Sequence, residues 1–138
     1  MTHRSKFVSA AAAYLAVTFL SAFGWHVVLF SDVYRAAGVR GEPMFALGIG
    51  AILIQAVVVA HLYPRLSGTG TAASEGLKFG LLLGLLMGSY GALAEAAKFD
   101  VGSVASWVFY EGIYFVLQFA LAGIAVGLVY GSRRSQEA

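Results

Sequence analysis

The sequence predicts an all-α integral membrane protein: an antiparallel, up-down four-helix bundle with both termini in the cytoplasm. The 138-residue chain is 59% hydrophobic and only 12% charged, and its mean hydropathy is +0.79. A soluble domain of this size has too little interior to bury so much apolar surface. Four long apolar stretches run through the chain, separated by polar connections, and together they predict a single membrane domain over residues 1–138.

The four apolar stretches are each long enough to cross a hydrocarbon core of about 30 Å, because a helix rises about 1.5 Å per residue. Backbone groups inside lipid must hydrogen-bond within their own segment, so each stretch is expected to be a helix. The expected helices cover residues 8–30, 45–63, 77–97 and 104–130.

The first stretch also fits a second interpretation, a secretory signal peptide. Basic residues precede it, and small residues occur near Ser21 and Ala22. The apolar run nevertheless continues through Phe30, which is longer than an ordinary signal core and favours an uncleaved helix.

Basic residues predict the orientation of the bundle. Four crossings would place both termini and the connection 64–76 on one side, together with most of the basic residues. These residues are Arg4, Lys6, Arg65, Lys78, Arg133 and Arg134, against Arg35, Arg40 and Lys98 on the other side. The positive-inside rule then puts both termini in the cytoplasm. We expect a multi-pass protein of the bacterial cytoplasmic (inner) membrane.

Two glycine ladders are the most specific pattern in the chain. They are Gly80, Gly84 and Gly88 in the third stretch, and Gly123, Gly127 and Gly131 in the fourth. Spacing of four residues puts each ladder on one helix face, where the missing side chains allow another backbone to approach closely. Matching the ladders pairs Gly80 with Gly131, Gly84 with Gly127, and Gly88 with Gly123. They would form either a seam within the chain or, on one helix, a face that docks a partner or a second copy.

A polar cluster is expected in the outer half of the bundle. Glu111 lies inside the fourth stretch, and Tyr114 and Gln118 follow on the same helix face. The glycine register would bring Glu95 to the same layer. An ionisable residue at such depth is by default a functional hypothesis. Two neighbouring carboxyls would suit proton or cation exchange, whereas in the structural alternative Glu95 pairs with Lys98 and Glu111 only fixes helix packing.

The histidines do not predict a haem or metal site. His26 lies near the outer end of the first stretch and His61 near the inner end of the second, so most of the membrane thickness separates them. We expect both to be interfacial side chains, beside Trp25 and Tyr63. The chain has no cysteine, and no Ser, His, Asp constellation has matching depths. No catalytic residue, metal or cofactor is therefore expected.

The four short spans, the Trp25–Phe30 segment (25–30) and the glycine-rich third span resemble small bacterial four-helix membrane families of unknown function. The resemblance implies no activity. The first functional hypothesis is a noncatalytic subunit or helix-packing module of a membrane assembly. The alternative is a small proton- or cation-coupled transporter using Glu95 and Glu111, and a membrane enzyme acting on lipid or quinone ranks third. The expected partners are the lipid bilayer and other membrane helices, in a homo-oligomer or larger complex, and a net charge of +2 gives no reason to expect nucleic acid.

Overall fold

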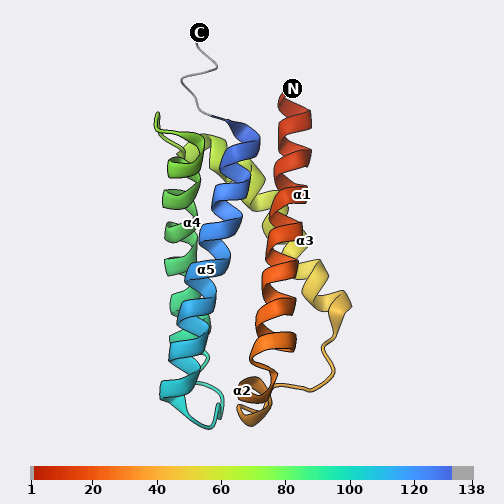
Figure 1. The fold of residues 1–138 in the computed structure, drawn as a ribbon, viewed down its shortest axis with the longest axis vertical. Helices are drawn as coiled ribbons and strands as arrows, with labels where there is room; N and C mark the ends of the chain where they lie inside the picture. The colour runs from red at the N-terminus through yellow and green to blue at the C-terminus, as the bar shows by residue number, and fades with distance from the viewer. Residues whose placement is uncertain (1, 132–138) are drawn as a thin grey trace.

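A computed structural model describes residues 2–131, and these residues fold into helices joined by short connections (Figure 1). Arg133 and Arg134, which contributed to the orientation argument, lie outside the described residues. The elements in chain order are α1 (His3–Ala22), η1 (Phe23–Leu29), α2 (Ser31–Ala36), α3 (Phe45–Leu66), α4 (Ala72–Gly88), η2 (Ser89–Ala94) and α5 (Val104–Tyr130). The elements η1 and η2 are π-helical and continue α1 and α4 without a break.

Four helical spans in the described chain are long and apolar enough to cross a membrane, as the sequence predicted. They are His3–Leu29, Phe45–Leu66, Ala72–Ala94 and Val104–Tyr130. The first and third begin five residues before the predicted limits. The physical reason is N-capping, because the hydroxyls of Thr2 and Thr71 accept hydrogen bonds from the backbone N–H groups of Ser5 and Ser74, at 3.2 Å each.

The helices pack in the order α4, α5, α1, α3. The closest packing joins α4 to α5, α1 lies against both α5 and α3, and α3 makes little contact with α4 or α5. The beginning of α1 and the end of α5 lie at one end of the molecule, and α2 lies at the other (Figure 1). A dense core fills the end near the termini, where Tyr14, Tyr63, Phe119, Val126 and Tyr130 are buried.

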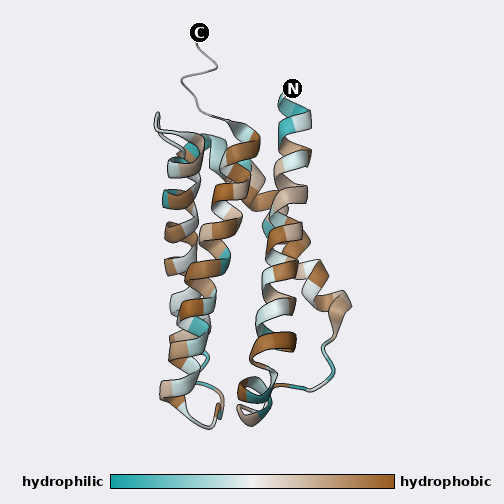
Figure 2. Ribbon diagram, in the orientation of Figure 1, coloured by the Kyte–Doolittle hydropathy of each residue, from teal (hydrophilic) through white to brown (hydrophobic). Residues whose placement is uncertain are grey.

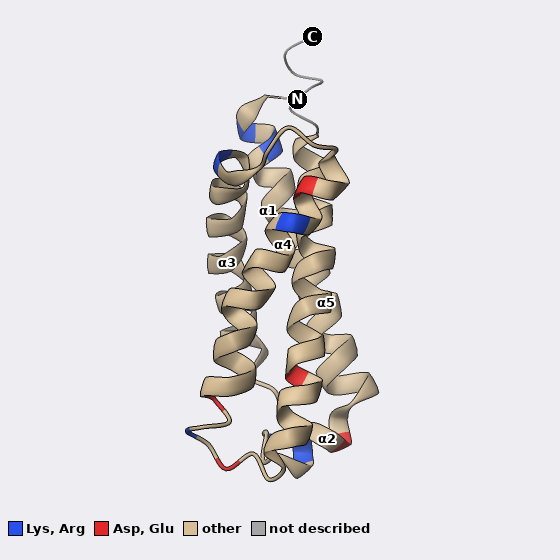
Figure 3. Ribbon diagram, turned by 90° about the vertical axis from the view of Figure 1, so that its left-hand side faces the viewer, with Lys and Arg blue, Asp and Glu red and all other residues tan. Residues whose placement is uncertain are grey.

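Apolar residues cover much of the outer surface of the four helices (Figure 2). Leu20, Leu47, Ile54, Leu85 and Leu128 are each at least 60% exposed. Lysine and arginine lie towards both ends of the described chain, and most of the acidic residues lie towards the end away from the termini (Figure 3). This distribution is what a protein needs if hydrocarbon surrounds its middle and water its two ends.

Glycines line the α4–α5 contact, but in a different register from the predicted one. A Cβ at Gly80 would lie closer than 3.0 Å to the carbonyl of Phe119, and one at Gly123 would lie 2.7 Å from the Cα of Gly80. Gly84 and Gly88 instead face Phe115. The ladder also begins earlier than predicted, because Gly76 meets both Gly123 and Gly127.

The end-to-end pairing of the ladders is therefore wrong. A Cβ on Gly131 would meet no atom of the described residues within 4 Å, and the φ of +76° at Gly131 ends α5. The physical reason is the geometry of the hairpin. Residues equally distant from the facing ends of η2 and α5, at Ala94 and Val104, come level with one another. Gly80 therefore meets the middle of α5 and not its end.

Candidate functional site

The site centres on Glu111, which is buried in α5 with 5% of its surface exposed. One carboxyl oxygen, Oε1, lies 3.1 Å from Nε2 of His26 in η1. The other ring nitrogen of His26, Nδ1, lies 3.0 Å from the backbone carbonyl oxygen of Ala22. The expectation that His26 is only an interfacial side chain is wrong, because η1 turns it inward to the acid.

This geometry determines where protons can reside. A carbonyl oxygen only accepts, so the hydrogen bond to Ala22 requires a proton on Nδ1 of His26. The short Nε2–Oε1 contact then needs one further proton, carried either by the imidazole or by the carboxyl of Glu111. Both arrangements leave the pair with no net charge. Loss of the shared proton would place a nitrogen lone pair against a carboxylate and leave a buried negative charge, which is costly.

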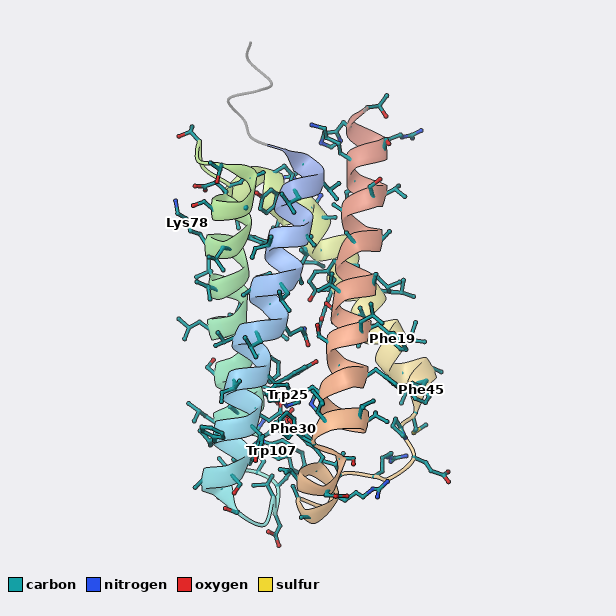
Figure 4. All side chains as sticks on the ribbon, viewed as in Figure 1. Phe19, Trp25, Phe30, Phe45, Lys78 and Trp107 are labelled. Carbon is teal, nitrogen blue, oxygen red and sulfur yellow. The ribbon has the colours of Figure 1, made fainter. Side chains whose placement is uncertain are left out.

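An aromatic shell surrounds the pair. The ring of His26 lies 4.4 Å from that of Tyr34 and 4.3 Å, edge-on, from that of Tyr114. The indole N–H of Trp25 donates to the Tyr34 hydroxyl at 2.9 Å, and Trp107 donates to the Gly91 carbonyl at 3.0 Å. Figure 4 shows Trp25, Phe30 and Trp107 together where the end of the first span approaches α5.

Tyr34, in α2 outside the membrane spans, is a neutral member of this shell. It is 4% exposed, and its burial and the neighbouring carboxyl of Glu111 raise its pKa well above the ordinary value for tyrosine. Its hydroxyl therefore keeps its proton at physiological pH and remains able to donate a hydrogen bond.

A cavity of about 310 Å³ lies beside the pair, between α1, α3 and α5. Thr18, Gln55 and Gln118 contribute polar side chains to its wall, and the Tyr14 hydroxyl donates to Oε1 of Gln55 at 2.9 Å. Thr18 is 3% exposed, and its Oγ1 has no hydrogen-bond partner among the described residues, although it lies near the Tyr14 hydroxyl. The cavity therefore joins the charged pair to a line of neutral polar groups.

The structure brings together three of the four residues of the predicted polar cluster. Glu111, Tyr114 and Gln118 all line the cavity. Glu95 does not, because it follows η2 and faces a separate cleft beside Gly38 and Trp107. The α5 face that bears Glu111 is turned towards α1, whereas α4 packs on a different face of α5, so an α4 residue cannot join this layer from the seam.

Glu95 also lacks its expected partner. Lys98 donates instead to the Tyr90 hydroxyl at 2.7 Å, and the described residues show no ion pair between Glu95 and Lys98. Partial burial, followed by the charge of Glu111, raises the pKa of the Glu95 carboxyl, and Lys98 opposes this effect. Glu95 thus influences the site only from a distance.

A second buried acid, Glu75 in α4, was missed by the sequence analysis. Its carboxylate accepts from the Gly68 backbone at 2.7 Å and from Lys78 at 2.8 Å. A Cβ at Gly68 or Gly70 would lie closer than 3.0 Å to this side chain. The connection before α4 is therefore organised around Glu75.

Sequence reasoning also missed His26, Tyr34 and Thr18. A signal for His26 was present, since His26 and Glu111 both lie towards the same outer end of apolar stretches. His61 is exposed on α3, far from this group. The described residues contain no cluster of three acidic or histidine side chains that could hold a metal ion.

Together, the fold and the site define a helical protein with four potential membrane spans and a buried acid–imidazole pair beside a polar cavity. No family model, curated protein or solved structure matches the chain.

Proposed function

We propose that this chain is a noncatalytic membrane protein that acts as a subunit or helix-packing module of a membrane assembly. In the proposed arrangement it is an antiparallel bundle in the bacterial inner membrane with both termini in the cytoplasm. The expectation that a glycine ladder docks a partner no longer supports this proposal, because the α4–α5 seam uses the glycines of both helices. The support for a role as a subunit comes instead from the outer face of α3.

The observation that carries the proposal is a pair of small residues on the outer face of α3. Ala46 and Gly50 are four residues apart, and a Cβ at Gly50 would meet nothing within 4 Å. Small residues at this spacing let two membrane helices approach closely, whereas a helix face that contacts only lipid does not require small residues. The first half of α3 is largely exposed, as Phe45 and Leu47 show. A helix from another subunit would fit this face.

The test is the mass of the purified protein in mild detergent, measured by light scattering. We expect wild-type protein to be larger than a single chain and Gly50→Leu to shift towards the single chain while keeping its helical circular dichroism. An integer multiple of the chain mass identifies a homo-oligomer, and any other mass identifies a second subunit. A single chain for wild type in every mild detergent and in nanodiscs would refute the proposal.

The second candidate is a proton- or cation-coupled transporter, and the His26–Glu111 pair is the observation that favours it. Histidine changes its charge near neutral pH more readily than any other side chain, and an ionisable group within a membrane span commonly marks an ion pathway. Glu95, the second acid of this candidate, faces a neighbouring cleft and not the cavity beside Glu111. The packed core around Tyr14 and Val126 closes the other end of the molecule, so transport requires a second conformation or a second subunit.

Glu111→Gln tests the transporter, because it keeps the shape of the side chain and removes the titratable charge. We expect the folded variant to lose pH-driven proton or cation flux in reconstituted vesicles, while Glu42→Gln, in the exposed connection before α3, retains it. Wild-type vesicles without flux under any imposed gradient would refute this candidate and leave the subunit proposal intact.

A further inference from the structure

We infer that the space between α1, α3 and α5 binds a membrane-soluble molecule with a neutral, hydrogen-bonding head and an apolar tail. This inference goes beyond both proposed functions, because it assigns a ligand and requires neither an assembly nor proton movement. It stands on the cavity beside His26 and Glu111, on the polar groups in its wall and on an apolar cavity that adjoins it.

The head compartment is the 310 Å³ cavity. Volumes of this order are typical of the smaller ligand-binding sites. Three helices supply its polar groups: Thr18 from α1, Gln55 from α3 and Gln118 from α5. Thr18 and Gln118 are 3% and 4% exposed, and the Thr18 hydroxyl lies near the Tyr14 hydroxyl without a hydrogen bond of normal geometry in the described chain. A buried hydroxyl whose hydrogen bonding is incomplete is unfavourable in an apolar medium, and the head of a ligand would complete it.

The absence of net charge on the pair favours a neutral head. His26 and Glu111 share one proton and have no net charge together, so the cavity offers no unpaired counter-ion. A charged head of either sign would lose its hydration in this cavity without gaining an opposite charge, which is costly. Hydroxyl or carbonyl groups instead match the amides of Gln55 and Gln118, which can both donate and accept.

The tail compartment is an apolar cavity of about 330 Å³ between η1, α3 and the connection before α3. It shares Ala22, His26, Gly48 and Ile52 with the head compartment, so the two cavities adjoin. Aromatic and aliphatic side chains form most of its wall; they include Phe19, Phe23, Val27, Phe45 and Ile49. Figure 4 shows Phe19 and Phe45 on the side of α1 away from Trp25. An acyl or prenyl chain would find the same surroundings here as in the bilayer.

Gly48 marks the passage between the two compartments. It lines both cavities, and a Cβ at this position would meet nothing within 4 Å. Gly50 lies about 200° further around the same helix, on the opposite face. A leucine at residue 48 would therefore extend into the ligand space from a Cβ that meets no described atom within 4 Å, and a leucine at residue 50 would leave that space open.

The experiment is native mass spectrometry of protein incubated with single probes in detergent. The probes are 1-monoolein, with a hydroxyl head, decylubiquinone, with a carbonyl head, and oleate, with a charged head at pH 8. We expect wild type and Gly50→Leu to retain one molecule of at least one neutral probe per chain, and Gly48→Leu to retain at least tenfold less. Retention of only one neutral probe identifies the head chemistry and supports the inference.

Thr18→Val provides a second variant, because it removes the hydroxyl and keeps the shape of the side chain. It should weaken retention severalfold with an unchanged thermal midpoint. Three results would overturn the inference: no neutral probe retained by wild type, equal retention by Gly48→Leu and Gly50→Leu, or oleate retained as well as the neutral probes. None of them bears on the mass or flux measurements above, so failure here is distinguishable from failure of either proposed function.

Discussion

Replacing Gly80 with alanine is the sharpest perturbation of the α4–α5 seam. The new Cβ would lie 2.9 Å from the carbonyl carbon of Phe119 and 3.1 Å from the Cα of Ala120, and closer still to the Phe119 oxygen. All three atoms belong to the backbone, so no side-chain rotation relieves the contact. The helices must separate by roughly 1 Å, which forfeits a quarter to a half of the dispersion energy of the contacts that open.

Over-packing of this kind costs about 1–3 kcal/mol. Alanine also gains up to about 1 kcal/mol over glycine from its intrinsic helix propensity, so a matched control is needed. Gly112 in α5 provides it, because a Cβ there would meet nothing within 4 Å. We expect Gly80→Ala to be about 1–3 kcal/mol less stable than Gly112→Ala. Gly84→Ala should lie between them, since its nearest contact is 3.1 Å from the Phe115 oxygen.

The assay is reversible unfolding in mixed micelles as the mole fraction of denaturing detergent rises, followed by circular dichroism. The free energies of unfolding of the three variants should follow the order of the contacts. If Gly80→Ala equals or exceeds Gly112→Ala in stability, the two backbones are not in close contact at Gly80, and the argument for the seam fails.

Three further predictions concern the charged residues and the connections. Glu75→Ala removes the acceptor for the Gly68 N–H, so it should lower the thermal midpoint and speed hydrogen exchange in residues 67–71; unchanged exchange there would contradict the organising role of this acid. The pKa of Glu95 is raised in the folded protein, so the folded state holds its proton more tightly, and this contribution to stability should be lost as pH rises from the ordinary value of 4.5 through the raised pKa. Glu95→Gln should flatten that dependence of the thermal midpoint, and an identical slope in wild type and variant would refute the assignment. Because the chain has no cysteine, Thr69→Cys and Glu42→Cys report orientation: an impermeant maleimide applied to intact cells should label only residue 42, and labelling at residue 69 would reverse the proposed topology.

The apolar stretches predicted the helices well, because a segment suited to lipid must form its backbone hydrogen bonds within itself, as a helix does. The apolar stretches located all four spans, and errors occurred only at their ends, where capping by Thr2 and Thr71 and the η2 segment changed the limits. Glycines of α4 and α5 lie where the two backbones approach closely. Their spacing could not give the register, because the register depends on where the connection between the two helices closes.

The candidate site was harder to predict, since its residues come from three distant parts of the chain. Glu111, Tyr114 and Gln118 share a face of one helix, so spacing alone grouped them. His26 lies on a different helix from Glu111, 85 residues away in the sequence, so no spacing pattern relates the two. The cavity depends on how α1, α3 and α5 pack against one another. A pattern within one stretch of the sequence does not predict the packing between separate helices.

The π-helical segment η1 makes the meeting of His26 and Glu111 depend on the number of residues in one turn. A π-turn bonds residue i to i+5 and so holds one residue more than the α-helical turn that it interrupts. If Phe23–Leu29 formed regular α-helical turns with the same number of residues, each residue would advance by about 100°, which is more than in the wider π-turn. The imidazole of His26 would then be carried past the side of the helix that faces Glu111, while the length and hydrophobicity of the span would not change. Deleting one residue between Ala22 and His26 would have a smaller effect, because it removes the residue that the π-turn accommodates and leaves the later residues on nearly the same side. The contact between His26 and Glu111 therefore needs either the π-turn with its extra residue or a regular α-helix without that residue.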